Sequence, residues 1–383
     1  MAVEGDKFVN ILVANLGSTS VKYQLLDMPG ENVVARGKVE RVTDYRSAVE
    51  EIRKSHATVD AVAFKTVHGG PDYRGTHLVD DGVLAALEEF SVVAPLHNRI
   101  YLDGIRAFQQ AMPATPMVAA FETEFHSHRP PHVWHYGIPQ EWSEQYGIVR
   151  YGFHGASHEW VSVRSAEMLG LPSENLRVVS CHLGGSSSVC AIRGGKSLDC
   201  SMGFSPQSGL ENATRHGDLD PFVILYLQKK LGIPLEEIIE RLLRDGGLAG
   251  LSGIEGGDMR DIVKAAENGD ARASEAFDQF CYDVKKYIGA YAAAMEGLDA
   301  LVFTGGIGEN RFRVRSLICL GLTFLGIEMD EECNVLEGGD RVISARASRT
   351  KVLVVEANEE RIVARRAERA LRRLENPPIP IAR

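Results

Sequence analysis

Two stretches that combine glycine with small hydroxylated residues are the first candidates for chemistry in this sequence. In ILVANLGSTSVKYQLLD, residues 11–27, an apolar run breaks at Gly17 and resumes after Ser20. RVVSCHLGGSSSVCAIRGGKSLD, residues 177–199, repeats this order about 167 residues later, so that Gly17 aligns with Gly184. Glycine lets backbone N–H groups approach phosphate oxygens, and hydroxyl groups add donors. One such loop is equally typical of a plain hairpin, but two copies at half-chain spacing predict a duplicated domain with a nucleotide between its halves.

A third glycine-rich stretch follows an expected buried strand. In LVFTGGIGENRFRVR, residues 301–315, Gly305, Gly306 and Gly308 precede an expected helix. Alone, this pattern is also typical of a tight strand-to-helix turn. After two phosphate loops, we favour a surface on which the base and ribose of a nucleotide pack. The pattern is not the dinucleotide fingerprint GxGxxG, because its third glycine is missing, and GxxxxGK[ST] does not occur in the sequence.

The elements that must position these loops alternate along the chain, which predicts an α/β protein with helices covering its sheets. Apolar runs predict strands within residues 10–16, 60–69, 115–123, 176–183, 188–194, 299–306 and 350–358. Apolar residues at spacings of three and four predict helices within 160–170, 220–232, 234–247 and 274–297. From the repeat we expect one domain over residues 1–148 and a nucleotide-binding domain over 149–367, with a C-terminal helix at about 368–383 returning to the first.

Composition narrows the class of protein. The 383 residues suffice for two domains, and a net charge of -10 disfavours nucleic acid or an anionic membrane as the main partner. The six cysteines form no CxxC pair, which predicts reduced thiols. The polar, acidic N-terminus does not match a signal peptide, and no apolar run is long enough to span a membrane. We therefore expect a soluble cytoplasmic protein.

The chain resembles the acetate kinase family, within the superfamily of actin, Hsp70 and sugar kinases. The matching motifs run in family order over nearly the whole chain: NLGSTSVKYQL, VHGG, APLHN, PMVAAFETEFH, RYGFHGASH, HLGGSSSV, GKSLDCSMGFSP, TRHGDLDP, KYIGAYAAAMEGLDALVFTGGIGEN and EANEE. The resemblance implies two duplicated actin-like (ribonuclease H-like) domains with a nucleotide cleft between them. It also implies a homodimer that uses ATP and Mg²⁺ to phosphorylate a short-chain carboxylate, such as acetate, to an acyl phosphate. Composition and spacing alone indicate only a nucleotide-binding α/β protein.

The resemblance also implies roles for individual residues. Those expected at the reacting groups are Arg215, His154, Glu122, Lys65 and His97. Those expected at the nucleotide are Asn15, Ser18, Ser20, Lys22, His182, Gly184, Gly185, Ser186, Gly305, Gly306, Gly308 and Asn310. A small apolar pocket for the acyl tail is expected from Val67, Leu96, Phe153 and Pro206. The metal ion is expected at Asn15 and Glu359.

Three positions depart from the family pattern. Lys65 replaces an arginine, and an ammonium group cannot make the forked contact of a guanidinium with a carboxylate. Glu122 replaces an aspartate, which displaces the carboxylate by roughly 1 to 1.5 Å, and Gly185 replaces an asparagine. Lys65 and Glu122 could pair with each other, one side chain being shorter and the other longer. The alternatives are a related enzyme for a different small acid, or a nucleotide-binding regulatory protein that has lost phosphoryl transfer.

Several other patterns have two interpretations. The i, i+4 spacing of His154 and His158 is that of a zinc pair, although we favour the start of a loop. A second cluster contains four histidines, for which a transition-metal site is a minority interpretation: His126, His128, His132 and His135. Asp218 and Asp220 are expected to cap the following helix, with a role at Mg²⁺ as the alternative. RDGGLAGLSG, residues 244–253, is interpreted as a helix end and an interdomain turn.

Overall fold

The computed structural model describes residues 9–375 except residues 57 and 96. The chain divides into two compact units, which we call unit 1 (Met1–Ser127 with Asn358–Arg383) and unit 2 (His128–Ala357). The expected boundaries at residues 148 and 367 differ from this division. Residues 128–148 belong to unit 2, and the C-terminal helix already begins at Glu359 and packs on the sheet of unit 1. No helix in the described part of the chain is long and apolar enough to cross a membrane.

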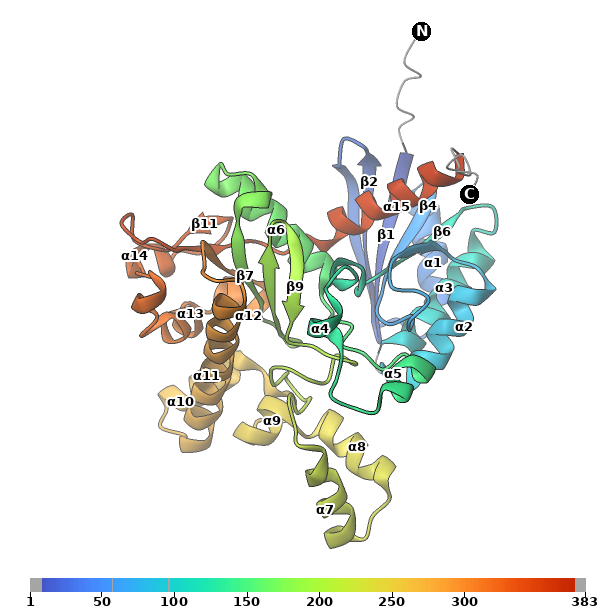
Figure 1. The fold of residues 1–383 in the computed structure, drawn as a ribbon. Coiled ribbons are helices and arrows are strands. Elements are labelled where there is room, and N and C mark those ends of the chain that lie inside the picture. The colour runs from blue at the N-terminus through green and yellow to red at the C-terminus, as the bar shows by residue number, and fades with distance from the viewer. Residues whose placement is uncertain (1–8, 57, 96, 376–383) are drawn as a thin grey trace. The chain divides into compact units, whose positions relative to one another are not determined.

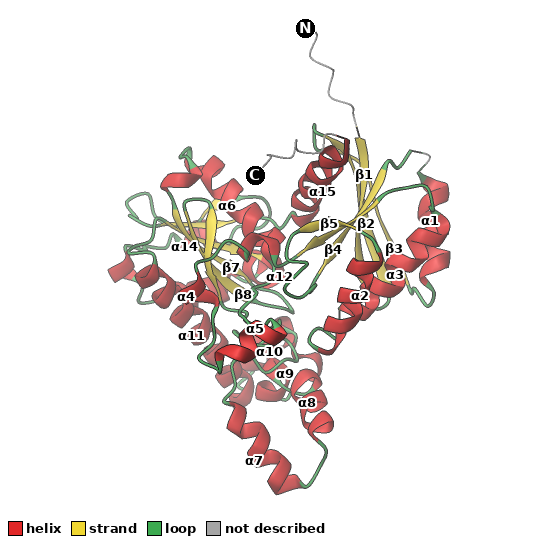
Figure 2. Cartoon of the chain, turned by 45° about the vertical axis from the view of Figure 1, so that its right-hand side comes forward, coloured by secondary structure: helices red, strands yellow, loops and turns green. Residues whose placement is uncertain are grey.

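Unit 1 is built around a six-stranded mixed sheet in the order β3-β2-β1-β4-β6-β5. β1 is antiparallel to β2 and parallel to β4, and β4 is parallel to β6. The helices α1 and α3 lie on one face of this sheet, and α15 lies on the other (Figures 1 and 2). The strands are β1 (Val9–Gly17), β2 (Ser20–Met28), β3 (Asn32–Glu40), β4 (Ala61–Thr66), β5 (Thr76–Leu78) and β6 (Met117–Phe121). The helices are α1 (Tyr45–Ser55), α2 (Asp81–Glu89), α3 (Asn98–Ala111) and α15 (Glu359–Glu375), with 3₁₀ turns at Phe90–Val92 and Glu124–His126.

Unit 2 repeats the same strand order and directions, β9-β8-β7-β10-β12-β11. β7 is antiparallel to β8 and parallel to β10, and β10 is parallel to β12. The expected duplication is therefore confirmed at the level of topology. The strands are β7 (Arg177–His182), β8 (Ser188–Arg193), β9 (Lys196–Cys200), β10 (Ala300–Thr304), β11 (Arg341–Val342) and β12 (Lys351–Val354).

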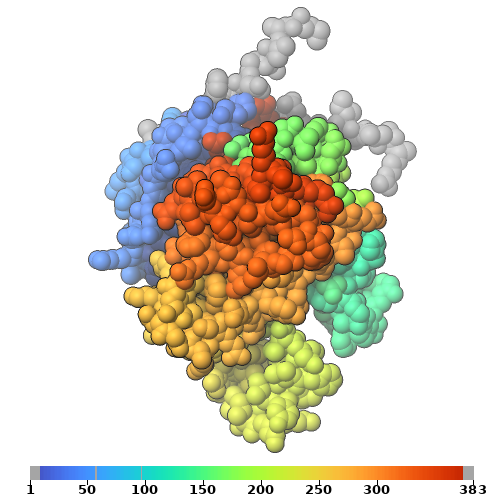
Figure 3. Space-filling view, turned by 90° about the vertical axis from the view of Figure 1, so that its left-hand side faces the viewer, coloured from blue at the N-terminus to red at the C-terminus, as the bar shows by residue number. Residues whose placement is uncertain are grey.

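The helices of unit 2 are more numerous than those of unit 1. They are α4 (Pro131–Trp134), α5 (Gln140–Tyr146), α6 (Gly155–Leu169), α7 (Pro221–Leu231), α8 (Leu235–Arg244), α9 (Gly247–Ser252), α10 (Met259–Glu267), α11 (Ala271–Ala294), α12 (Gly305–Asn310), α13 (Phe312–Cys319) and α14 (Glu331–Asn334). Short 3₁₀ turns occur at Ser173–Asn175, Glu255–Gly257 and Thr323–Leu325. The helices α7 and α8 project from the body of unit 2 (Figure 3).

The two faces of the unit 2 sheet have different chemistry. Successive side chains of a strand point to opposite faces, so Val179 and Cys181 of β7 lie on one face and Ser180 and His182 on the other. The first pair belongs to the apolar core, together with residues of α11 such as Phe280. The face with Ser180 and His182 is covered by α6. Polar side chains are thus collected between α6 and the sheet.

Most expected elements are confirmed, and two local predictions are wrong. All seven predicted strands and four predicted helices are present. Asp220 caps α7 through Phe222 N, but Asp218 accepts hydrogen bonds from Gly209 N and the Tyr287 hydroxyl and is not a cap. The stretch 244–253 is not an interdomain turn, since it contains α9 and lies within unit 2. A helical pattern of only six residues is too short to distinguish from a glycine-rich turn.

Candidate functional site

The second glycine loop connects β7 to β8 and is fixed by hydrogen bonds within unit 2. The hydroxyl of Ser187 bridges the backbone of Gly184, and Ser187 N donates to the side chain of Asn212 at 2.7 Å. Ala213 N donates to the carbonyl of Gly185 at 2.9 Å. A Cβ atom on Gly185 would meet no described atom within 4 Å, so glycine here leaves space beside the loop.

The third glycine stretch begins a helix directly, because α12 starts at Gly305 instead of after the glycines. Gly305 has φ +78°, and a Cβ atom there would lie 2.7 Å from the carbonyl oxygen of Leu183. Only glycine combines this backbone conformation with such a close approach. The amides of Ile307 and Gly308 both donate to the same carbonyl, which joins α12 to the end of β7.

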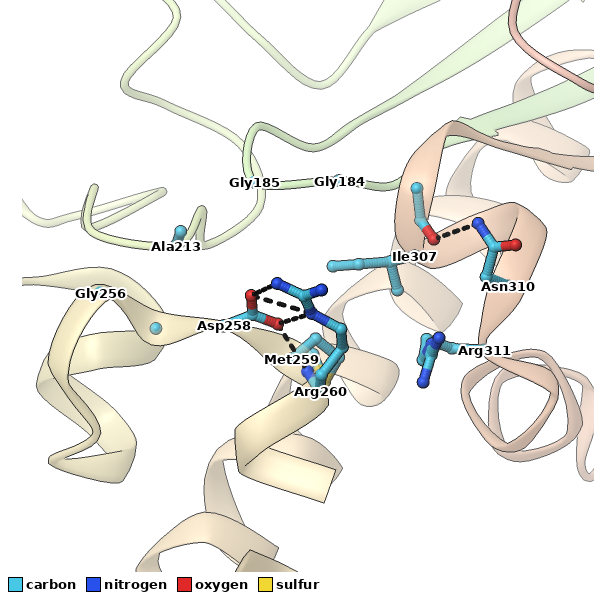
Figure 4. A pocket seen from close by; sticks show the side chains of 12 residues that line it. Gly184, Gly185, Ala213, Gly256, Asp258, Met259, Arg260, Ile307, Asn310 and Arg311 are labelled. Atoms are coloured by element: carbon cyan, nitrogen blue, oxygen red, sulfur yellow. Dashed lines mark hydrogen bonds and ion pairs between the residues drawn. The ribbon is translucent and has the colours of Figure 1, made fainter. Parts of the chain in front are cut away.

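These two stretches form one wall of a cavity of about 480 Å³ in unit 2. In Figure 4, Ile307 and the side chain of Arg260 face the space beside Gly184 and Gly185. Arg260 pairs with Asp258 at 2.5 Å, and Asn310 donates to the carbonyl of Gly306 at 3.0 Å. The lining residues are Gly184, Gly185, Ala213, Gly256, Gly257, Asp258, Met259, Arg260, Gly306, Ile307, Asn310 and Arg311.

Sequence reasoning identified only part of this lining and missed residues 256–260. The sequence signal that could have identified residues 256–260 was the stretch EGGDMR. Its paired glycines lie just beyond the segment that we interpreted as a helix end. Gly257 has φ +61°, and a Cβ atom there would lie 2.0 Å from the carbonyl oxygen of Ala213. This close approach brings the segment against the loop that carries Arg215, and it depends on a tertiary contact that spacing alone does not reveal.

Arg215 is a buried cation, and no carboxylate pairs with it among the described residues. Its Nη1 donates to the carbonyl of Pro206 at 2.7 Å, so two predicted site residues do meet. Burial lowers the pKa of Arg215 to about 10, which still leaves it charged at neutral pH. Since a buried charge is costly without a partner, this position is suited to an anionic ligand. Phe153, predicted for the acyl pocket, is also buried in unit 2.

The backbone that carries Arg215 is held by α9. Asn212 N donates to the carbonyl of Arg215 at 3.0 Å, and Leu248 N donates to the carbonyl of Asn212 at 2.9 Å. A Cβ atom on Gly247 would lie 2.2 Å from Asn212 O and 2.6 Å from Arg215 O. The glycine at this position therefore allows the helix to pack directly on the arginine loop.

His154 and His182 come together in unit 2. Their rings stack with centroids 4.3 Å apart. Nδ1 of His154 lies 2.8 Å from the hydroxyl of Ser188, and Nδ1 of His182 lies 2.7 Å from that of Ser157. His154 has φ +56° immediately before α6, a conformation that is uncommon outside glycine and is found at functional sites.

Lys65, Glu122 and Glu359 form a buried cluster in unit 1. The ammonium group of Lys65 lies 2.5 Å from Glu359 Oε2 and 3.2 Å from Glu122 Oε1. The pairing of Lys65 with Glu122 that the sequence suggested is therefore present. Burial acts against the charge of Lys65, but Glu359 and Glu122 outweigh it and raise its pKa. Burial raises the pKa of Glu122, and the repulsion of Glu359 adds to this while Lys65 opposes it.

The remaining predicted residues of unit 1 lie near the first glycine loop or near this cluster. Ser18 lies in a tight hairpin between β1 and β2, with Ser20 opposite Gly17 and Lys22 opposite Asn15. The Tyr101 hydroxyl contacts Asn15 Oδ1 at 3.5 Å and lies close enough to Lys65 to affect its pKa. His97 precedes α3 and Val67 is buried just after β4. Leu96 lies outside the described residues. The other predicted nucleotide residue, Ser186, lies in the second loop, and Gly308 lies in α12.

Comparison with known proteins decides the family. A sequence model described as "Acetokinase family" matches residues 46–365. The chain belongs to this acetokinase family. An acetate kinase of Carboxydothermus hydrogenoformans is 41% identical over 93% of this chain and 98% of its own. An acetate kinase of Caldanaerobacter subterraneus subsp. tengcongensis is 42% identical over 95% and 99%.

Solved structures of acetokinase relatives extend the agreement to the fold. The crystal structure of Porphyromonas gingivalis acetate kinase matches with a TM-score of 0.85 at 37% identity, covering 95% of this chain and 100% of that one. A propionate kinase from Francisella tularensis matches with a TM-score of 0.86 at 32% identity, covering 94% and 98%. The duplicated actin-like fold is therefore confirmed. As a member of the family, the chain is a phosphotransferase with a carboxyl group as acceptor.

Proposed function

We propose that this protein transfers the γ-phosphoryl group of ATP to acetate or a close relative, giving an acyl phosphate and ADP. The observation that carries the proposal is Arg215, a buried guanidinium group without a carboxylate partner among the described residues, in the same unit as the glycine-lined cavity. A carboxylate oxygen forms the new bond to phosphorus while the bond from phosphorus to the bridging oxygen of ADP breaks. No covalent enzyme intermediate is required, because the carboxylate is itself the nucleophile.

The cavity of unit 2 is suited to the adenosine part of ATP. Ile307 and the aliphatic part of Met259 offer apolar surface to a base, and the planar guanidinium of Arg260 can stack on it. Gly184 and Gly185 leave their backbone accessible to phosphate oxygens. Replacing Arg260 by alanine should raise the Kd for ATP about tenfold. Titration calorimetry would measure this, with the exposed Arg313→Ala as the matched control.

Catalysis at the transferring phosphoryl group would rest on positioning and charge stabilisation. We assign Arg215 to the carboxylate and the equatorial phosphoryl oxygens, and His154 to a hydrogen bond with one of those oxygens. Lys65 is already in ion pairs with Glu122 and Glu359, so it is less suited than Arg215 to bind the substrate carboxylate. We therefore assign Lys65 to holding these two glutamates in place, and His97 to the rim of the site.

Mg²⁺ fits the oxygen atoms of the unit 1 cluster. No cluster of three or more His, Cys, Asp or Glu side chains suited to a metal exists in the described ranges, but Mg²⁺ keeps several waters and needs few protein ligands. Oε2 of Glu122 is buried and has no hydrogen-bond partner within the described part of the chain, which is the state expected of an oxygen reserved for a cation. We propose that Glu122, Glu359 and Asn15 would hold the ion. It would supply charge neutralisation between the phosphates.

In unit 2, the acyl tail would pack on Phe153 and Pro206. The other two residues expected for this pocket are Val67, which belongs to unit 1, and Leu96, which lies outside the described residues. A small apolar surface of this kind favours acids of few carbon atoms over longer ones. Gln207, next to Pro206, has both of its side-chain polar atoms buried, and neither has a hydrogen-bond partner among the residues that the structure describes. An acid that carries a polar group could satisfy them, which is the specific reason to test relatives of acetate. Those acids are the alternative substrates that we propose.

A homodimer in the cytoplasm is the remaining part of the proposal. Large apolar side chains are exposed on the projecting helices α7 and α8, among them Phe222 at 72% and Tyr226 at 61%. Light scattering should give a mass near twice 42.0 kDa. Phe222→Glu combined with Tyr226→Glu should give the monomer mass, whereas Phe324→Glu, at an equally exposed site in unit 2, should not. All six cysteines are unpaired, in keeping with a reducing compartment.

A hydroxylamine trap for acyl phosphates tests the proposed reaction. The protein is incubated with ATP, Mg²⁺ and one acid of one to five carbons at a time, and the panel includes acids that carry a polar group. We expect hydroxamate from acetate or from another short acid in the series. If protein that binds ATP gives no hydroxamate with any of these acids, the proposed function is wrong, and a nucleotide-binding regulatory role without transfer takes its place.

A further inference from the structure

A second histidine, His158, lies behind His154 and is connected to it through one serine hydroxyl. His158 is fully buried, and its Nε2 lies 2.8 Å from the hydroxyl of Ser188. That hydroxyl is also 2.8 Å from Nδ1 of His154. Nδ1 of His158 lies 2.8 Å from the hydroxyl of Ser180. The four side chains form an unbroken row from the interior of unit 2 to His154.

Sheet register and helix spacing build this row. Ser188 of β8 is the Cα partner of His182 in β7, and Ser180 is two residues before His182, so all three lie on one face of the sheet. His154 and His158 are four residues apart at the start of α6, on the helix face that meets these strands. The i, i+4 pair that resembles a metal site is thus placed against hydroxyl groups.

The shared hydroxyl couples the protonation of the two rings. A serine hydroxyl has one hydrogen, so Ser188 can donate to only one of the two histidine nitrogens that it contacts. The other nitrogen must carry a hydrogen and donate to Ser188. Either His158 donates from Nε2 and His154 accepts at Nδ1, or the reverse holds.

Ser180 decides between the two arrangements. In the reverse arrangement, neutral His158 would carry its hydrogen on Nδ1 and donate to Ser180, whose own hydroxyl hydrogen would then need another acceptor. Ser180 is fully buried, and the described residues provide its hydroxyl with no second hydrogen-bond partner. A buried donor without an acceptor is costly. In the first arrangement Ser180 donates to His158, His158 to Ser188 and Ser188 to His154, so each hydrogen in the row has an acceptor.

We propose that His158 and Ser188 are positioning residues that hold His154 in the tautomer with its hydrogen on Nε2. The ring of His154 then presents an N–H donor from Nε2, because its Nδ1 is the acceptor for Ser188. A donor suits an anionic phosphoryl oxygen, whereas an unprotonated nitrogen would repel it. The use of this donor in phosphoryl transfer rests on the proposed function, but the tautomer itself does not.

Nuclear magnetic resonance of protein labelled with ¹⁵N at histidine reads the tautomer without substrate. Nitrogens with and without hydrogen have well separated shifts, and His154→Gln identifies the ring among the 12 histidines. We expect hydrogen on Nε2 of His154 in the wild type and a mixture of tautomers in Ser188→Ala. Hydrogen on Nδ1 in the wild type, or no change in Ser188→Ala, would overturn the proposal.

Replacements of His158 separate positioning from packing. Glutamine can place an amide N–H close to the position of Nε2, so His158→Gln should keep the tautomer of His154. Asparagine reaches only the position of Nδ1, so His158→Asn should lose the single tautomer of His154 although it introduces the same amide group. If both variants fold and behave alike, His158 has only a structural role.

Kinetics then connect the tautomer with the reaction. Ser188→Ala should lower kcat roughly 10- to 100-fold, the effect of one hydrogen bond to a charged group, with little change in either KM. Ser188→Thr, which keeps the hydroxyl, should recover much of the rate. Ser165→Ala is the matched control, because Ser165 is a buried serine of α6, the helix that carries His158, and its hydroxyl donates to the carbonyl of Val161 and to no other group among the described residues. The predicted tautomer in a protein that makes no acyl phosphate would refute the proposed function and leave the positioning inference intact.

Discussion

Removing the ammonium group of Lys65 should destabilise unit 1 in a pH-dependent way. In Lys65→Met the side chain keeps a similar length and apolar stem, but the charge between Glu122 and Glu359 is lost. The two carboxylate oxygens that contact Lys65 can lie no farther apart than the sum of its contact distances, 3.2 Å and 2.5 Å. With an effective dielectric constant of about 20, their repulsion is about 3 kcal/mol. The side chains are largely buried, so screening by solvent reduces this little.

Melting temperature measured by calorimetry gives the size of the effect. A loss of about 3 kcal/mol in the free energy of unfolding should lower the melting temperature of unit 1 by about 6 to 12 °C near pH 7.5. Lys38→Met is the matched control in unit 1, because Lys38 pairs with Glu40 on the surface. Loss of this pair should lower the melting temperature far less, because exposed ion pairs contribute little to stability.

The pKa of Glu122 decides how the loss of stability in Lys65→Met depends on pH. Burial and Glu359 raise the pKa of Glu122 in the folded protein, so folding favours its protonated form. A carboxyl group of this kind supports stability at low pH, and its support is lost as the pH rises through the folded pKa. In Lys65→Met the opposing effect of Lys65 is lost and only the weaker effect of Arg366 still lowers this pKa, so the deficit relative to wild type should be full near pH 7.5 and shrink near pH 5. A deficit that is equal at both pH values, or no larger than that of Lys38→Met, would refute the reasoning.

Two further predictions concern the departures from the family pattern and the cavity wall. Lys65→Arg alone should lower kcat/KM about tenfold, because the longer side chain must fit against both carboxylates, and adding Glu122→Asp should restore much of it. Steady-state kinetics would detect the coupling, and additive effects of the two changes would contradict it. Gly257→Ala should weaken ATP binding and lower the melting temperature, since its Cβ atom would lie 2.0 Å from the carbonyl oxygen of Ala213. Gly256→Ala has the same kind of backbone strain at φ +74° with nothing within 4 Å, so equal effects of the two alanines would exclude the close approach as the cause.

The fold was predictable from the sequence because its signals are local. The two glycine loops and the alternation of strands with helices indicated the duplication, and both sheets have the same strand order. The domain boundaries were not predictable in this way. The helix from Glu359 packs on a sheet that begins some 350 residues earlier, and no local pattern specifies such a return.

The residues of the candidate site were predictable where they belong to a sequence motif. They were not predictable where only the tertiary structure brings them together. The resemblance placed His154 and Arg215, but spacing alone interpreted His154 and His158 as a metal pair or a loop start. The hydroxyls that they contact lie on β7 and β8, and strand register, which is not encoded locally, brings them to that face. Residues 256–260 were missed for the same reason, because their role depends on the close approach of Gly257 to Ala213.

The origin of the bridging oxygen in the product tests the central claim most directly. The protein is incubated with ATP, Mg²⁺ and acetate labelled with ¹⁸O in the carboxylate, and ³¹P magnetic resonance follows the phosphorus atom. Direct transfer predicts an acyl phosphate signal shifted by ¹⁸O in the bridging position, and its absence in Arg215→Ala. An acyl phosphate without the label at this position, or no acyl phosphate from acetate or any other short acid, would contradict the account.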